Sequence, residues 1–169
     1  AENIADYIFT NPTLPDDMVT YWDFNAPNIP NEPRDASAAA VMACALYELS
    51  MYNVEKATQY KQWADTIINN LSKNYRAPLN GNYGFILLHS TGAHNFERDV
   101  PLVYADYYFL EALLKKEKLE KELARSKGML SNEKFLNKAP AEKVAEERAK
   151  MDKYQQMMDD VLARLAQMK

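Results

Sequence analysis

Side chains that could carry out chemistry are concentrated in and beside two proline-containing loops. The first loop extends from Thr13 to Glu32, and the second from Pro78 to Pro101. Paired carboxylates are the groups that glycoside chemistry usually requires, since one donates a proton while the other acts as base or nucleophile. The carboxylates that are candidates for such a pair are Asp23, Asp35, Asp99 and Asp106.

Most of these carboxylates also have a structural interpretation, which we favour. Asp35 directly precedes a run of helix-forming residues and is suited to cap that helix. Asp106 is suited to accept hydrogen bonds from a neighbouring buried donor, and Asp99 lies in a loop. We therefore assign no catalytic residue.

The elements that must position these loops are helices. A short helix is expected up to Phe9, as the last turns of a longer one, and Asn11-Pro12 ends it. A helix of small residues is expected over 36–50, and an amphipathic helix over 54–75 whose apolar stripe includes Tyr60, Ile67 and Leu71. A small-residue inner helix followed by an amphipathic outer helix is the repeating unit of an α/α toroid.

The second loop contains a short apolar run before the next helix. Residues 84–89 are expected to form either a strand or a buried extended segment, because periodicity cannot separate the two. Pro101 then begins a helix that continues to about Leu114. At Lys115 the character of the sequence changes, since the apolar stripe is interrupted by a charged run.

Composition places limits on the class of protein. The 169 residues suffice for one ordinary domain, and 11 Tyr with 2 Trp provide many aromatic side chains. One cysteine, Cys44, permits no internal disulfide and no cysteine metal cluster, and no spacing predicts a metal or cofactor site. No apolar run approaches the roughly 20 residues of a membrane span. We expect a cytoplasmic protein with no membrane partner, unless an export signal lies upstream.

The net charge of −4 conceals an uneven distribution. Residues 1–114 contain 6 basic and 14 acidic side chains, a formal charge of −8, whereas residues 115–169 contain 14 basic and 10 acidic, a formal +4. Such asymmetry indicates a compositional boundary and suggests a polyanionic partner for the C-terminal part.

Heptad spacing of apolar residues dominates the C-terminal part. The first set alternates by four and three residues, and the second, after an expected loop at 131–140, keeps intervals of seven. Two such limbs predict an antiparallel coiled-coil hairpin. The expected core positions are Leu119, Leu123, Ser126 and Leu130, then Val144, Met151, Tyr154, Met158, Val161, Leu165 and Met168.

Four motifs of the first part resemble the C-terminal part of unsaturated glucuronyl hydrolases, glycoside hydrolase family 88. They are WDF at 22–24, PRDASAAAV at 33–41, GFILLHSTG at 84–92 and DVPLVYADYYFLEAL at 99–113. The resemblance implies an (α/α)6 toroid and hydrolysis of an unsaturated uronic acid from oligosaccharides left by polysaccharide lyases. In that family an aspartate protonates the C4=C5 double bond and water adds at C5. The family's catalytic aspartates precede the segment that these motifs match, so we expect the chain to be inactive.

The same resemblance implies three substrate-binding residues: Trp22, Arg34 and His89. Sugar sites combine aromatic faces with a few fixed polar groups, and Arg34 could meet a uronate carboxylate with two hydrogen bonds. The alternatives remain open: Trp22 as a core residue, Arg34 as a member of a structural ion pair, and His89 as a buried histidine.

The C-terminal part resembles the coiled-coil arm of bacterial valyl-tRNA synthetases. The segment LARSKGMLSNEKFLNKAPAEKVAEERAKMDKYQQMM at 123–158 carries the resemblance, which extends over about 119–169. It implies contacts between basic side chains and the tRNA backbone, which are electrostatic and sensitive to salt. A solvated coiled-coil face is the alternative for these charges. The residues expected to bind tRNA are Lys127, Lys134, Lys138, Lys143 and Arg148.

Together these observations predict an all-α chain with a partial (α/α)6 toroid segment at 1–114 and an antiparallel coiled-coil hairpin at 115–169. The leading functional hypothesis is an inactive fragment of an unsaturated glucuronyl hydrolase that recognises unsaturated uronic-acid oligosaccharides. The alternatives are a tRNA-binding arm, or a fusion with no selected function, of natural, engineered or assembly origin. A toroid segment with an uncovered packing face is also expected to self-associate.

Overall fold

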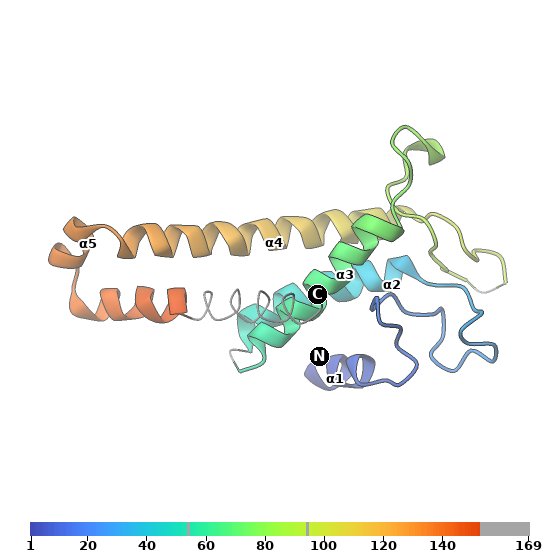
Figure 1. Cartoon of the computed structure of the whole chain (residues 1–169), viewed down its shortest axis with the longest axis horizontal. Coiled ribbons are helices and arrows are strands. Elements are labelled where there is room, and N and C mark those ends of the chain that lie inside the picture. Colours follow the sequence, from blue (N-terminus) through green and yellow to red (C-terminus); the bar gives the residue numbers. More distant parts are fainter. Residues whose placement is uncertain (54, 94, 153–169) are drawn as a thin grey trace, which may run out of the picture. The chain divides into compact units, whose positions relative to one another are not determined.

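The computed structural model describes residues 1–53, 55–93 and 95–152, apart from the side chains of Asn82, Lys134 and Leu136. Within these residues the regular structure is helical, which confirms the predicted all-α class (Figure 1). The only β pairing in the described part consists of isolated bridges, such as that between Arg76 and Leu87. The elements are α1 (Glu2–Phe9), α2 (Ala36–Tyr52), α3 (Ala57–Asn74), the short 3₁₀ helix η1 (Asn82–Gly84), α4 (Val103–Leu130) and α5 (Glu133–Lys138).

The chain folds as two compact units, Ala1–Lys115 and Lys116–Lys169. The first contains α1, α2, α3 and the beginning of α4. The second, which we call the arm, contains the remainder of α4, α5 and a further helical segment at 141–152.

Helix α2 is the central element of the first unit. Its N-cap is Asp35, whose carboxylate accepts a hydrogen bond from the backbone N–H of Ser37 at 3.0 Å, as the sequence predicts. Small side chains such as Ala39, Ala40 and Ala43 are fully buried, which lets neighbouring segments approach closely. The helix extends to Tyr52, two residues beyond the predicted end.

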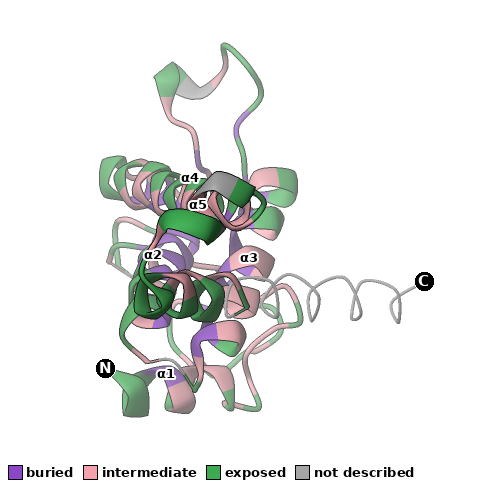
Figure 2. Cartoon of the chain, turned by 90° about the vertical axis from the view of Figure 1, so that its left-hand side faces the viewer, coloured by how far each residue is buried: buried purple, intermediate pink, exposed green. Residues whose placement is uncertain are grey.

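Helix α3 packs along α2, and buried residues gather on these two helices (Figure 2). The predicted apolar stripe is buried, with Tyr60, Ile67 and Leu71 inaccessible to solvent. The helix begins at Ala57, later than the predicted start at Val54, which lies outside the described residues. The side chain of Asn53 accepts a hydrogen bond from the N–H of Lys56 at 3.0 Å, and this local turn delays the helix.

The segment before α4 is irregular and anchored by Asp106. The Asp106 carboxylate accepts hydrogen bonds from the N–H groups of Ile86 and Leu87 at 2.9 and 2.8 Å. The prediction that Asp106 is the partner of a neighbouring donor is therefore confirmed, although Asp106 is half-buried and not fully buried. Within the run at 84–89, Gly84 ends η1 and Leu87 is fully buried and forms an isolated bridge with Arg76, while Gly84 and His89 are exposed. The run is therefore neither a strand nor an extended segment that is buried along its whole length.

The arm has the predicted core in its first limb. Leu119, Leu123 and Ser126 are each at most 6% exposed, and the hydroxyl of Ser126 donates to Glu147 of the returning limb at 3.0 Å. The predicted core positions Leu130, Val144 and Met151 are half-buried. Figure 1 shows this returning segment alongside the C-terminal half of α4. The antiparallel hairpin is therefore confirmed.

One prediction for the arm is wrong. Residues 131–140 are not a continuous loop, because α5 occupies Glu133–Lys138. Glu133 lies in its first turn, where a carboxylate stabilises the helix dipole, and the carbonyl of Asn132 accepts from the N–H of Phe135. The predicted core positions Tyr154, Met158, Val161, Leu165 and Met168 lie outside the described residues.

No helix in the described part of the chain is both long enough and apolar enough to span a membrane.

Candidate functional site

A hollow of about 440 Å³ lies at the N-terminus of α2. Three segments distant in sequence form it: residues 20–24, the first turns of α2, and residues 91–92, with Tyr104 of α4 beside them. Its walls combine aromatic rings with carboxylate, hydroxyl and backbone groups. The lining residues are Ile8, Thr20, Tyr21, Trp22, Asp23, Phe24, Asp35, Ser37, Ala38, Val41, Met42, Thr91, Gly92 and Tyr104.

Asp35 joins two of these segments. Its Oδ1 atom accepts hydrogen bonds from the N–H and hydroxyl of Ser37 and from the N–H of Thr91 at 3.2 Å. The hydroxyl of Thr91 in turn donates to the carbonyl of Arg34 at 3.0 Å. The carboxylate is thus engaged in holding the wall together, which supports its structural interpretation over a role as proton donor.

Trp22 also lines the hollow and is held by a hydrogen bond within its own loop. Its Nε1–H donates to Oε2 of Glu32 at 3.0 Å, and the indole is half-buried. This hydrogen bond lowers the pKa of Glu32, against the opposing effect of burial. Arg98 lies 3.7 Å from the same carboxylate oxygen. Because both ends of the hydrogen bond belong to one loop, the orientation of the ring is set locally.

Arg34 does not line this hollow. Its guanidinium donates to Asp17 Oδ1 at 3.1 Å and to the carbonyl of Val19, and it lies 4.6 Å from the centre of the Tyr21 ring. It faces a separate hollow whose lining includes Asp16 and Asp17. The arrangement matches the structural ion pair that the sequence left open as an alternative.

His89 also lies outside the lining of the hollow, although its backbone touches the same helix end. Its carbonyl accepts from the N–H of Ala36, at the first residue of α2. The side chain is 47% exposed, which excludes the buried histidine considered above, and its Nδ1 is 2.7 Å from Asp99 Oδ1. Both residues have positive φ, +62° for His89 and +57° for Asp99, a region that non-glycine residues rarely occupy.

Of the predicted substrate-binding residues, the structure therefore places Trp22 in the hollow and Arg34 and His89 beside it. Sequence reasoning did not identify Thr91 and Tyr104, which are brought here by chain segments far from Trp22. Gly92 lies close to the side chains of Glu97 and Tyr104. A Cβ atom at this position would lie 2.6 Å from Glu97 Oε2 and 2.9 Å from the Tyr104 hydroxyl, so a larger residue here would displace the ends of these side chains.

Of the four candidate carboxylates, Asp23 and Asp35 line the hollow, whereas Asp99 and Asp106 do not. Asp23 is exposed and accepts from the N–H of Asn25 at 2.8 Å, while Asp99 is paired with His89. Among the described residues no group of three or more histidine, cysteine, aspartate or glutamate side chains could hold a metal ion.

In the arm, the predicted tRNA-binding side chains differ from three other cations, Lys121, Arg125 and Lys150. Lys138, Lys143 and Arg148 are exposed and Lys127 is half-buried; within the described part of the arm no ion pair involves these four residues. The side chain of Lys134 lies outside the described residues. By contrast, three other cations lie within 3.1 Å of glutamates of the same helix: Lys121 with Glu117, Arg125 with Glu122, and Lys150 with Glu146.

Comparisons with known proteins separate the two parts of the chain. Over 122 residues it is 47% identical to an unsaturated glucuronyl hydrolase of Formosa agariphila, covering 70% of this chain and 30% of that protein. It is 34% identical over 110 residues to the unsaturated glucuronyl hydrolase of Bacillus sp. strain GL1, covering 62% and 29%. The crystal structure of an unsaturated glucuronyl hydrolase specific for heparin superposes with a TM-score of 0.69 at 45% identity, over 72% of this chain and 33% of that one.

The C-terminal part matches a different family. Residues 110–169 match the valyl tRNA synthetase tRNA binding arm. A valine–tRNA ligase of Clostridium perfringens is 53% identical over 57 residues, which cover 33% of this chain and 6% of that enzyme.

Both resemblances inferred from the sequence are therefore confirmed, and the chain spans about 30% of the length of the curated hydrolases that it matches. It combines a region similar to the helical-toroid unsaturated glucuronyl hydrolases with a C-terminal region that matches the tRNA-binding arm of valyl-tRNA synthetases.

Proposed function

We propose that the first unit contributes a binding surface for oligosaccharides that end in an unsaturated uronic acid. The observation that carries this proposal is the hollow at the start of α2, where Trp22, Phe24 and Tyr104 lie near Ser37 and Thr91. Aromatic faces with a few fixed polar groups are typical of sugar sites. One solved relative, 29% identical, is complexed with dGlcA-GalNAc6S.

The geometry supports binding without hydrolysis by these 169 residues. Asp35 is held by three hydrogen bonds within the wall, and Asp23 caps a local turn at Asn25. A general acid must be free to reach the atom that it protonates. We therefore propose that the first unit recognises the sugar and that the proton donor is not among the carboxylates of this hollow.

The chain has two tryptophans, which permits a matched test with dGlcA-GalNAc6S as ligand. We expect Trp22→Phe to weaken binding about tenfold, or about 1.4 kcal/mol, and to abolish the fluorescence change on titration. The control is Trp63→Phe, because Trp63 stacks on Phe9 at a centroid distance of 4.4 Å and does not line the hollow. Equal affinities of the two variants, or no binding by the unmodified chain, would contradict the proposal. Ultraviolet absorption of the C4=C5 double bond should persist in the mixture.

A second function is proposed for the arm, which we infer binds the phosphate backbone of tRNA. It is supported by the family match and by the basic side chains that no described ion pair engages. We expect Lys143→Glu and Arg148→Glu to weaken tRNA binding and to lower the slope of log K against log salt by about 1 for each contact removed. The control is Lys121→Glu, because Lys121 is already 2.6 Å from Glu117. A salt slope unchanged by both test variants would rule out these contacts.

A further inference from the structure

Helix α2 has the composition of a helix surrounded on all sides. Among its 17 residues, ASAAAVMACALYELSMY, Glu48 is the single charged side chain. A helix that is apolar around its whole circumference is normally buried around its whole circumference. In the structure, neighbouring elements cover only part of α2, since the residues Val41, Met51 and Tyr52 are 38%, 43% and 77% exposed.

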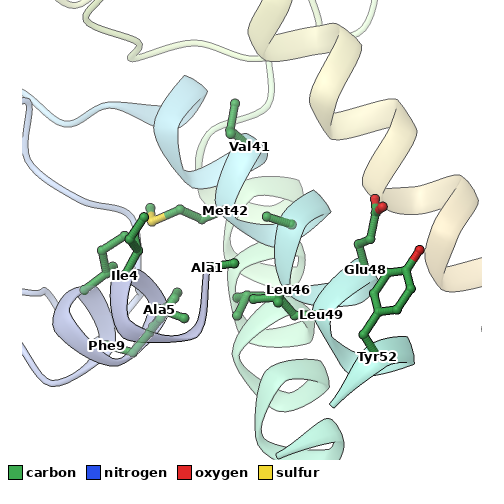
Figure 3. A pocket seen from close by; sticks show the side chains of 12 residues that line it. Ala1, Ile4, Ala5, Phe9, Val41, Met42, Leu46, Glu48, Leu49 and Tyr52 are labelled. Carbon is green, nitrogen blue, oxygen red and sulfur yellow. The ribbon is translucent and has the colours of Figure 1, made fainter.

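The open side of α2 forms an apolar groove with α1. The groove has a volume of about 580 Å³, and Figure 3 shows side chains of the two helices that line it, with Met42 extending toward Ile4. Among the described lining residues Glu48 has the only charged side chain, and the ammonium of Lys115 lies 2.6 Å from its carboxylate. The groove therefore offers mainly apolar contacts. Its lining residues are Ala1, Ile4, Ala5, Ile8, Phe9, Val41, Met42, Ala45, Leu46, Glu48, Leu49 and Tyr52.

A second apolar face lies on the part of α4 that belongs to the first unit. Val103, Tyr107, Leu110 and Leu114 are spaced by four, three and four residues, which places them on one side of the helix. Their exposed fractions are 73%, 60%, 47% and 65%. Monomeric proteins seldom leave extended helical stripes of this kind uncovered.

We propose that these two faces bind amphipathic helices equivalent to the part of the hydrolase toroid that this chain does not contain. The matched region is one third of the solved relative's chain, so two thirds of that helical protein has no counterpart in these 169 residues. An apolar two-helix groove accepts the ridge of a further helix. The partner is thus a helical polypeptide. The exposure of the two faces is observed directly, whereas the identity of this partner is inferred from the similarity to the hydrolases.

The test supplies that partner as a separate polypeptide. The Formosa agariphila relative, with the region matching this chain removed, is co-expressed with the full 169-residue chain, and complexes are measured by light scattering after size exclusion. We expect a one-to-one complex. Ile4→Glu should weaken it at least about 100-fold, because Ile4 lines the groove and a carboxylate buried there would have no partner.

The variant should fold, because Ile4 is 65% exposed in the chain alone. The matched control is Leu79→Glu, at a position 89% exposed and outside the groove, which should leave the complex intact. Circular dichroism of both variants checks that the helices are unchanged.

Two results would overturn the proposal. A homodimer of the chain that Ile4→Glu dissociates, with no affinity for the relative's segment, would make a second copy the occupant. A complex equally weakened by both variants would show that the groove is not the contact. Neither readout depends on sugar, and Trp22→Phe should leave the complex unaffected, so failure of this proposal is separable from failure of oligosaccharide binding.

Discussion

Asp35 shows which contacts of a single residue can be read from sequence. Its capping of α2 involves Ser37, two residues away, and helix-capping preferences predict such local bonds. Its hydrogen bond to the N–H of Thr91, 56 residues away, has no local signal. The same holds for Arg34, whose partner Asp17 lies in a loop without periodicity. The local hydrogen bonds of these residues were therefore predictable from the sequence, whereas their partners far along the chain were not.

Replacement of Asp35 by Ala is expected to destabilise the first unit by about 1–2 kcal/mol, since the helix loses its cap and the N–H of Thr91 loses its acceptor. The urea midpoint of unfolding measures this change. Asp23→Ala is the control, because Asp23 is exposed and its carboxylate accepts a hydrogen bond from the nearby N–H of Asn25. Equal midpoints for the two variants would contradict the role assigned to Asp35.

At the level of elements, spacing predicted the long helices better than the short ones. The stripe of α3 and the first limb of the arm repeat over several turns, so their buried faces follow from periodicity. Helix α5 has six residues, fewer than two turns, and Asn132 and Pro140 on either side are typical of a loop. The run at 84–89 was ambiguous because its periodicity does not identify its partner: Asp106, about 20 residues away, accepts hydrogen bonds from the N–H groups of Ile86 and Leu87.

The polar pair in the arm gives a prediction about pH. The hydrogen bond from Ser126 lowers the pKa of Glu147, burial opposes it, and Lys150 reinforces it. A carboxylate whose pKa is lower in the folded than in the unfolded state stabilises the folded state. This contribution is fully present when the pH is above the pKa of the unfolded state, about 4.3. This contribution is lost as the pH falls through the folded value. We therefore expect Ser126→Ala to lower the melting temperature near pH 7 but to have little effect near pH 2.

Helix ellipticity recorded during heating at each pH provides the measurement. Ser131→Ala is the matched control, because the Ser131 hydroxyl donates to the carbonyl of Gly128 and touches no carboxylate in the described contacts. A destabilisation by Ser126→Ala that is the same at both pH values would show that Glu147 is not its source.

At the scale of the whole molecule, composition anticipated two dissimilar parts, with formal charges of −8 for residues 1–114 and +4 for 115–169. The contacts divide the chain between Lys115 and Lys116. The sequence predicted an inner helix at α2, but its burial is a property of neighbours, and the described elements cover one side only. Periodicity indicates which residues form an apolar face that favours burial. It does not indicate whether a partner is present to cover that face.

The rate at which the thiol of Cys44 is alkylated can be used to measure local opening of the first unit. It is the chain's only cysteine, it is 5% exposed on α2, and the ammonium of Lys115 on α4 lies 3.2 Å from its sulfur. Burial raises the pKa of the thiol, which further slows alkylation. A reagent can therefore reach the sulfur only when α2 and the start of α4 separate, and the rate of labelling under native conditions reports how often that happens.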